Sequence, residues 1–283
     1  MKTVAHLSDL HFGSTDATVV EAMAAEVGAA EPSIVVVSGD LTQRARKQEF
    51  IQARAFLDTL PSPRLVVPGN HDVPLFDLYA RVFSPLSRYK RYISADTDPF
   101  YADSELAIAG INTSRSLTFK GGRINGEQLA RVMGSLADLP EDTTRIVVTH
   151  HPFEGVSAAD DEGVVGRARL AMTGFSRSRV DLILSGHMHL SRVGSSALQY
   201  AIEGYSALLV QAGTAISSRR RDTANSFNLI RIDWPSIDVE CRAWNPGSAR
   251  FFTSARQSFQ FGLGGWRQTE GPVVPTLTQG SVQ

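Results

Sequence analysis

Three short apolar runs of the chain each end in a glycine followed by a polar side chain. They read IVVVSGD, RLVVPGN and LILSGH, and end in Asp40, Asn70 and His187. Runs of this length that are rich in β-branched residues are typical of buried strands, and a glycine after a strand permits the turn that aims the next side chain. In open sheets of parallel strands connected by helices, the ligand site lies beyond the carboxyl ends of the strands. The sequence therefore predicts strands that deliver an Asp, an Asn and a His to one edge.

Nine apolar runs of strand length lie along the chain. The early runs alternate with amphipathic stretches at residues 18–30 and 43–60, which is the pattern of α/β units, and the later runs lie closer together. This mixture predicts an α/β fold in which two mixed β-sheets pack face to face as a sandwich and helices flank them. The expected strands fall within residues 3–10, 33–40, 64–70, 105–113, 144–151, 180–187, 206–214, 226–233 and 236–244.

The chain of 283 residues, 42% of them hydrophobic, is long enough to bury a large core, and we expect a single domain over residues 1–265. Residues 77–93 are rich in aromatic and basic residues and predict a helical cap at about residues 74–95; the alternative is a surface helix that packs its aromatics inward. Residues 266–283 are polar and lack periodicity, and we expect a flexible C-terminal tail there, or a segment that packs on a partner subunit.

Composition narrows the function classes. The net charge of −1 gives no global basic field, which disfavours nucleic-acid binding but leaves a local basic patch open. Cys241 is the single cysteine of the sequence, so an internal disulfide and a thiolate-bound metal cluster are both excluded. The N-terminus enters an alternating strand that contains Asp9 and does not resemble a signal peptide, and no apolar run is long enough to span a membrane. We therefore expect a cytoplasmic protein.

Two further apolar runs end in metal-binding residue types without an intervening glycine. AHLSDLHF supplies Asp9 and His11, and RIVVTHH supplies His150. Because residues two apart on an extended segment point to the same side, we expect Asp9 and His11 to act as one pair, and His187 and His189 as another.

Five of the seven histidines lie at these strand ends or directly after one. A lone histidine is more often a core or surface residue, but a set of five at one sheet edge favours a metal site. The five are His11, His71, His150, His187 and His189.

In order along the chain, these blocks resemble the five-block signature of the calcineurin-like metallophosphoesterases. The SDLHFG and GNHDV blocks are most similar to bacterial class III cyclic-nucleotide phosphodiesterases. The resemblance spans residues 9–189 and implies the four-layer metallophosphoesterase fold, which agrees with the strand pattern. The blocks are Asp9-x-His11, Gly39-Asp40, Gly69-Asn70-His71-Asp72, His150 and Gly186-His187-x-His189.

The resemblance also implies roles for these residues. One metal ion would be held by Asp9, His11 and His189. A second would be held by Asn70, His150 and His187, and Asp40 would bridge the two.

The GNHDV block holds two candidate catalytic residues. The resemblance implies that His71 protonates the leaving oxygen. We expect Asp72 to orient that imidazole by accepting its other N–H, or to act as the N-cap of a following helix.

Imidazole and carboxylate ligands without thiolates favour two divalent or mixed-valence transition metal ions, with Mn, Fe or Zn preferred over Ca or Mg. The implied activity is hydrolysis of a small phosphodiester by a metal-bridging hydroxide, with a 3',5'-cyclic nucleotide as the first candidate substrate. Two alternatives stay open: a nuclease or phospholipid-headgroup phosphodiesterase on the same site, and a non-catalytic scaffold. A complete ligand set argues against the scaffold.

Other residues near these strand ends have weaker patterns. We expect His6 in the core and His151 beside the metal ligands or exposed. The basic run Arg219–Arg221, and the loop with Asn112 and Arg115, are candidate contacts for substrate phosphate, with solvated loops as the alternative. The aromatic cap and the C-terminal phenylalanines leave a homodimer open.

Overall fold

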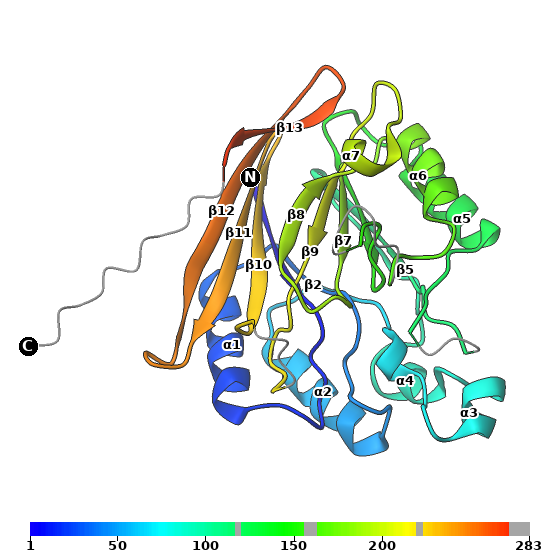
Figure 1. The fold of residues 1–283 in the computed structure, drawn as a ribbon, viewed down its shortest axis with the longest axis vertical. Coiled ribbons are helices and arrows are strands. Elements are labelled where there is room, and N and C mark those ends of the chain that lie inside the picture. The colour runs from blue at the N-terminus through cyan, green and yellow to red at the C-terminus, as the bar shows by residue number, and fades with distance from the viewer. Residues whose placement is uncertain (117–119, 156–162, 219–222, 272–283) are drawn as a thin grey trace, which may run out of the picture.

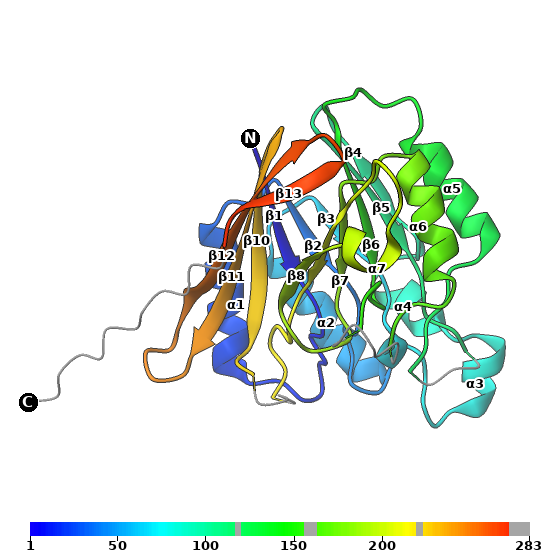
Figure 2. The same ribbon diagram turned by 45° about the horizontal axis from the view of Figure 1, so that its top comes forward.

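A computed structural model describes residues 1–116, 120–155, 163–218 and 223–271 of the chain. Two β-sheets lie face to face in the middle of the molecule, and helices cover the outer face of each sheet (Figure 1). This arrangement confirms the predicted α/β sandwich. Turning the molecule shows the same four layers in depth (Figure 2).

The first sheet is mixed. Its three N-terminal strands pair in parallel, and its other four pair antiparallel. In spatial order it contains β13 (Gly265–Glu270), β12 (Arg250–Gly262), β11 (Ser236–Asn245), β10 (Ser226–Asp233), β1 (Lys2–Leu7), β2 (Ile34–Val37) and β3 (Arg64–Val66).

The second sheet has four parallel strands in its centre and an antiparallel strand at each edge. In spatial order it contains β4 (Phe100–Ala102), β5 (Leu106–Ile111), β6 (Thr144–Thr149), β7 (Leu182–Ser185), β9 (Leu208–Gln211) and β8 (Arg192–Ser195).

Helices flank both sheets. The two helices α1 and α2 cover the first sheet, and α5 and α6 cover the second (Figure 1). None of the helices in the described residues is long and apolar enough to cross a membrane. The helices are α1 (Ala17–Ala29), α2 (Lys47–Thr59), the 3-10 turn η1 (Asn70–Asp72), α3 (Leu78–Phe83), α4 (Ser87–Tyr92), α5 (Gly126–Leu136), α6 (Ala168–Arg177) and α7 (Ala197–Tyr200).

Strand alternation divides the core into three layers. Because successive side chains of a strand point to opposite faces, β1 sends Val4 between the sheets, and Ala5 and Leu7 toward the α1 and α2 layer. The second sheet does the same, with Ile146 facing the first sheet and Val147 facing α5 and α6. The central strands of both sheets are thus buried on both faces, which explains their nearly continuous apolar runs.

All nine expected strands are present, but the sequence analysis missed β4, β8, β12 and β13. These strands lie at or near the sheet edges, and their side chains are mostly half-buried or exposed. β4 is only three residues long, and the other three mix polar with apolar residues, so none forms a continuous apolar run. The second predicted helix also begins four residues late, at Lys47. Ala45 has a left-handed φ of 53° and Arg46 is the N-cap, so the helix starts after this turn.

The expected tail begins inside a strand. Residues 266–270 belong to β13, so that part of the prediction is wrong, while residues 272–283 lie outside the described residues. Trp266 is 2% exposed, and its indole Nε1 donates to Asp181 Oδ1 at 3.0 Å. Its ring packs against Trp234 and Phe261. One buried aromatic residue therefore fastens a strand whose other side chains are largely polar.

Replacing this tryptophan is expected to destabilise the fold. Trp266→Ala should lower the free energy of unfolding by about 3–5 kcal/mol, as truncation of a buried aromatic usually does. Urea denaturation followed by circular dichroism measures the change. The control is Leu263→Ala in the adjoining turn, because Leu263 is 93% exposed. Equal stability of both variants would show that Trp266 does not anchor β13.

Residues 74–95, where a helical cap is expected, contain the short helices α3 and α4, which are separated by residues 84–86. In α4, Tyr89 is fully buried and its hydroxyl donates to the carbonyl of Val66 at 2.9 Å. This helix packs against α2, as an ordinary surface helix would. The preceding helix α3 lies at the periphery of the molecule.

Candidate metal centre

The carboxyl ends of strands from both sheets meet at one edge of the sandwich. In the first sheet, the N–H of Asp9 after β1 donates to the carbonyl of Gly39 after β2 at 3.1 Å. In the second sheet, the N–H of Gly186 after β7 donates to the carbonyl of His150 after β6 at 3.0 Å. These bonds extend the parallel pairing past the strand ends and hold the following loops side by side.

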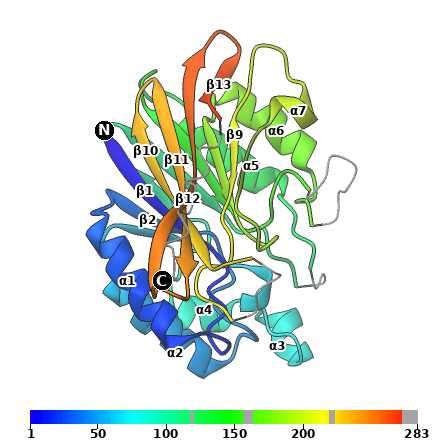
Figure 3. The ribbon, with the colours of Figure 1, turned by 60° about the vertical axis from the view of Figure 1, so that its left-hand side comes forward.

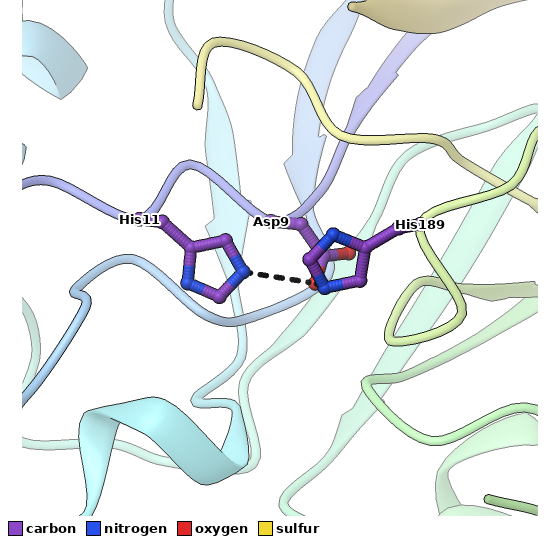
Figure 4. Close-up of side chains that lie close together, drawn as sticks. All are labelled: Asp9, His11 and His189. Atoms are coloured by element: carbon purple, nitrogen blue, oxygen red, sulfur yellow. Dashed lines mark ion pairs between the residues drawn. The ribbon is translucent and has the colours of Figure 1, made fainter. Parts of the chain in front are cut away.

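Asp9, His11 and His189 form the first cluster of candidate ligands (Figure 4). Asp9 Oδ1 lies 3.5 Å from His11 Nε2 and 3.4 Å from His189 Nε2. Asp9 Oδ1 and His11 Nε2 are buried and make no hydrogen bond within the described part of the chain. Buried polar atoms are rarely left without a partner, so this geometry fits a bound cation.

A second cluster adjoins the first through Asp40. Asp40 Oδ2 lies 3.8 Å from His11 Nε2 and 3.3 Å from His150 Nε2. Asn70 Oδ1 lies 3.0 Å from the same His150 nitrogen. Asp40 therefore stands between the two clusters, at the position where the sequence analysis expects a bridging ligand.

His187 stands slightly apart. Its ring centroid lies 5.1 Å from that of His150, and its backbone N–H donates to Asp9 Oδ2 at 3.0 Å. Among the described residues, it belongs to none of the three groups whose ligand atoms lie within 4.8 Å of one another. Its role as a ligand stays a prediction.

The backbone at the ligands is strained. Twelve non-glycine residues in the described part of the chain have positive φ angles, and five of them are predicted ligands. Such conformations cluster at functional sites, where the surrounding structure holds them. The expectation that each pair lies on an extended segment is therefore wrong: left-handed turns aim the side chains. The five ligands are Asp9, His11, Asp40, His187 and His189, with φ angles from 50° to 71°.

Two of the glycines that precede ligands are required by close approach. A Cβ at Gly186 would overlap Ser8 Oγ and lie 2.6 Å from Asp9 Oδ2. A Cβ at Gly69 would overlap Asp40 Oδ1. These glycines allow one ligand loop to touch the next, whereas the left-handed turn expected of such a glycine occurs at Gly39, with a φ of 95°.

Backbone carbonyls orient three of the imidazoles. The Nδ1–H groups of His11, His71 and His150 donate to the carbonyls of Thr42, Gln43 and Ser38, at 3.4, 2.8 and 2.8 Å. Each ring then presents Nε2 to the site, which is how protein groups behind a metal ligand usually fix its tautomer.

His189 Nδ1 instead bonds to Thr214 Oγ1 at 2.8 Å. Sequence reasoning missed Thr214, although it ends the run LLVQAGT. Glycine followed by a polar residue after a strand was the available signal.

Asp72 does not contact the His71 ring as expected. Its carboxylate accepts hydrogen bonds from the N–H groups of Gly69, Leu41 and Thr42 and from the Thr42 hydroxyl. It is not the N-cap of α3 either, because Asp77 fills that position. Asp72 thus joins the loop after β2 to the loop after β3.

The charged side chains of the centre change one another's pKa values. Burial lowers the pKa of His150, but the nearby Asp40 carboxylate outweighs this effect and raises it to about 9. Burial and the positive charge of His150 lower the pKa of His187 to about 4. His187 is therefore neutral near pH 7, as a metal ligand must be. A proton on His150 competes with a metal ion for Nε2.

Neighbouring residues have structural contacts. His151 Nδ1 accepts from Thr113 Oγ1 at 2.8 Å, and its Nε2–H donates to the Lys120 carbonyl at 2.9 Å. His6 is fully buried in β1, as expected, with Nε2 at 2.9 Å from Ser38 Oγ. Both histidines support the loops around the ligands.

The two candidate phosphate contacts have different outcomes. Arg115 donates to the carbonyls of Asn112, Ser114 and Arg123 and to Gln128 Oε1, so its guanidinium fastens its own loop. In the run Arg219–Arg221, all three residues lie outside the described residues.

Comparison with known protein families identifies the class to which the chain belongs. The family model described as calcineurin-like phosphoesterase matches residues 2–191. The protein belongs to this family, and all seven predicted metal ligands fall within the matched range. The membership confirms the resemblance seen in the sequence and the expectation of a metal-dependent phosphoesterase.

Two curated relatives are similar to part of the chain. The glycerophosphodiester phosphodiesterase GpdQ of Enterobacter lignolyticus is 29% identical over an alignment of 164 residues, and the match covers 53% of this chain and 57% of the relative. A probable cyclic nucleotide phosphodiesterase of Synechococcus is 25% identical over 162 residues, which are 56% of this chain and 58% of the relative. The chain thus spans less than two thirds of the length of either relative.

Solved structures with the same fold include a dimetal phosphatase from Danio rerio and a purple acid phosphatase from yellow lupin, both with a TM-score of 0.61. The first is 14% identical and covers 86% of this chain and 96% of its own. The second is 16% identical and covers 91% of this chain and 53% of its own. These similarities concern the fold, and they agree with the sandwich described above.

Gly186→Ala is expected to weaken the metal centre, because the added methyl group would overlap Ser8 and displace Asp9. We expect Mn²⁺ affinity to fall by about 10–100-fold, as it does when groups that orient ligands are disturbed. Titration calorimetry on metal-stripped protein measures the affinity. Gly134→Ala in α5 is the matched control, since no atom of the described residues outside the local helix backbone and its chain neighbours lies within 4 Å of its added Cβ. An unchanged affinity of Gly186→Ala would contradict this account.

Proposed function

We propose that the protein is a phosphodiesterase with two metal ions, held by the two clusters that share Asp40. The observation that carries the proposal is the convergence of two carboxylates and four imidazoles on one edge, with ligand atoms within 4.8 Å in each group. Metal ions bound there would neutralise the phosphate charge and lower the pKa of a bound water.

The charge of the site suits an anionic ester. Asp9 and Asp40 supply about two negative charges, while the imidazole and amide ligands are neutral when they bind a metal. Two divalent cations would leave the centre positive even with a hydroxide bound. A singly charged phosphodiester therefore matches the centre.

His71 is the proposed catalytic residue. Its backbone N–H donates to Asp40 Oδ1 at 2.8 Å, which places His71 beside the ligand that the two clusters share. Its Nδ1–H is held by the Gln43 carbonyl, so Nε2 is the ring atom that can hold a proton for the leaving oxygen. Asp72 is a positioning residue, because it braces the turn that carries His71.

A groove of about 560 Å³ adjoins His71 and gives the substrate a place beyond the phosphorus atom. Arg44, Arg46 and Leu75 are among the residues that line it. The N–H groups of both arginines donate to Glu49 Oε2, which fixes their backbone. The groove therefore combines the cationic side chains of the arginines with the acidic Glu49 and the apolar Leu75.

A 3',5'-cyclic nucleotide remains the first candidate substrate, and the name of the Synechococcus relative supports it. The alternative is a phosphodiester with a lipid headgroup. It is supported by the name of GpdQ and by the arginines of the groove, which suit an anionic or polyhydroxyl headgroup. A nuclease is less favoured because of the net charge of −1.

The metal dependence is tested with bis(p-nitrophenyl) phosphate and p-nitrophenyl phosphate. Metal-stripped protein should be inactive, and added Mn²⁺ should restore hydrolysis of the diester in preference to the monoester. Asn70→Ala should lose Mn²⁺ and activity together, because Asn70 contacts His150 in the second cluster. The control is Asn245→Ala at the end of β11. No turnover of either ester by metal-loaded protein would favour the scaffold alternative.

If His71 protonates the leaving oxygen, the loss of activity in His71→Ala should depend on how readily the leaving group departs without a proton. With a 3',5'-cyclic nucleotide or glycerophosphocholine, His71→Ala should lower kcat by about 10²–10⁴-fold. With bis(p-nitrophenyl) phosphate the loss should be far smaller, because a nitrophenolate leaves without a proton. Metal content should stay unchanged. An equal loss on both kinds of substrate would assign His71 a different role.

A further inference from the structure

Apolar side chains point to solvent along α3 and the turn before it. The described residues include twelve large hydrophobic side chains that are exposed, and six of them lie between residues 75 and 83. Single exposed hydrophobics are common, but a contiguous group marks an interaction site. The group, here called the α3 patch, consists of Leu75, Phe76, Leu78, Tyr79, Val82 and Phe83.

The helix α3 is inverted with respect to an ordinary surface helix. Leu78, Tyr79, Val82 and Phe83 share one face at 3.6 residues per turn, and they are 51–75% exposed. The charged residue Arg81 points the other way, is 4% exposed, and donates to the carbonyl of Pro74 at 2.9 Å. Surface helices normally bury the apolar face and expose the charge. The outward face of α3 is therefore suited to contact with another surface rather than with water.

The surroundings of the patch are basic. Residues 74–95 hold four basic residues and one acidic residue, a net charge of +3, whereas the whole chain carries −1 and the rest therefore −4. The acidic residue, Asp77, is occupied as the N-cap of α3 and lies 3.8 Å from Arg88. Lys90 and Arg91 are exposed on α4. An apolar face beside basic side chains is the pattern of elements that lie on anionic membranes.

The patch continues into the groove at the metal centre. Leu75 lines that groove together with His71. The guanidinium of Arg44, also in the groove, lies 5.6 Å from the ring centroid of Phe76 in the patch. A surface that receives the patch would therefore lie next to the mouth of the groove.

We propose that α3 docks the protein on an anionic lipid surface, with its outward aromatic and aliphatic side chains in the interface and the basic residues of α4 beside the headgroups. A second copy of the chain is a poorer occupant. A twofold contact would bring two segments of +3 against each other, and like charges oppose association. Figure 3 shows α3 at the outer limit of the molecule, where a flat surface can reach it.

Vesicle binding tests the proposal directly, without reference to hydrolysis. The metal-loaded protein is sedimented with vesicles of phosphatidylcholine alone or of phosphatidylcholine and phosphatidylglycerol in equal parts. We expect at least fivefold stronger partitioning into the anionic vesicles, and a loss of that preference in 0.5 M NaCl. The double variant Tyr79→Ser, Phe83→Ser should partition at least tenfold more weakly. Lys90→Glu with Arg91→Glu should abolish the preference for anionic lipid.

Leu198→Ser is the matched control, because Leu198 is 85% exposed but lies on α7, at the other end of the chain's fold from α3. Hydrolysis of bis(p-nitrophenyl) phosphate should be unchanged in the Tyr79, Phe83 variant, which also shows that it folds. Equal vesicle binding by parent and variant, or no binding by the parent, would overturn the proposal. So would a dimer in light scattering that the double variant dissociates, since the patch would then join two copies. If the parent protein binds anionic vesicles but does not hydrolyse bis(p-nitrophenyl) phosphate, the proposed function is wrong and the docking proposal stands.

Discussion

The carboxylate of Asp9 joins the two sheets at the metal centre. Its Oδ2 accepts the N–H of His187 from the second sheet, and its Oδ1 faces His11 and His189. The opposite sheets can approach this closely because Gly186 has no side chain to overlap Ser8. The sandwich and the site thus depend on the same contact, so any change in the packing of the sheets changes the distances between ligands.

The left-handed backbone conformation of five predicted ligands is unfavourable in free energy, and contacts with the rest of the fold maintain it. Residues in such conformations persist where surrounding hydrogen bonds determine them. Here Asp72 holds the two loops together with four hydrogen bonds, and backbone carbonyls fix the imidazoles. Buried layers on both faces of each sheet supply the stability that this rigid arrangement requires. The hydrogen bonds of these loops therefore hold the candidate ligands in place.

The sequence predicted the central strands and the residues at their ends, because buried parallel strands and glycine turns leave a strong local pattern. It failed where the structure depends on distant contacts. The pattern of β13 was hidden, since only Trp266 marks its burial and its partner Asp181 is 85 residues away. The role expected for Asp72 was wrong for a similar reason: its partner Thr42 comes from another strand end. Local sequence spacing shows which residues follow a strand, but not which loop they face.

The anchoring of α3 has a consequence for divergence within the family. Arg81 holds the helix through a backbone carbonyl, and Asp77 caps it through a backbone N–H, so neither contact depends on which side chains lie outward. Substitutions on that outward face leave the ligand loops and the buried layers unchanged. Under the proposed docking role of α3, natural variation can therefore alter where such a protein is recruited without altering its candidate metal ligands, which separates the evolution of location from the evolution of catalysis.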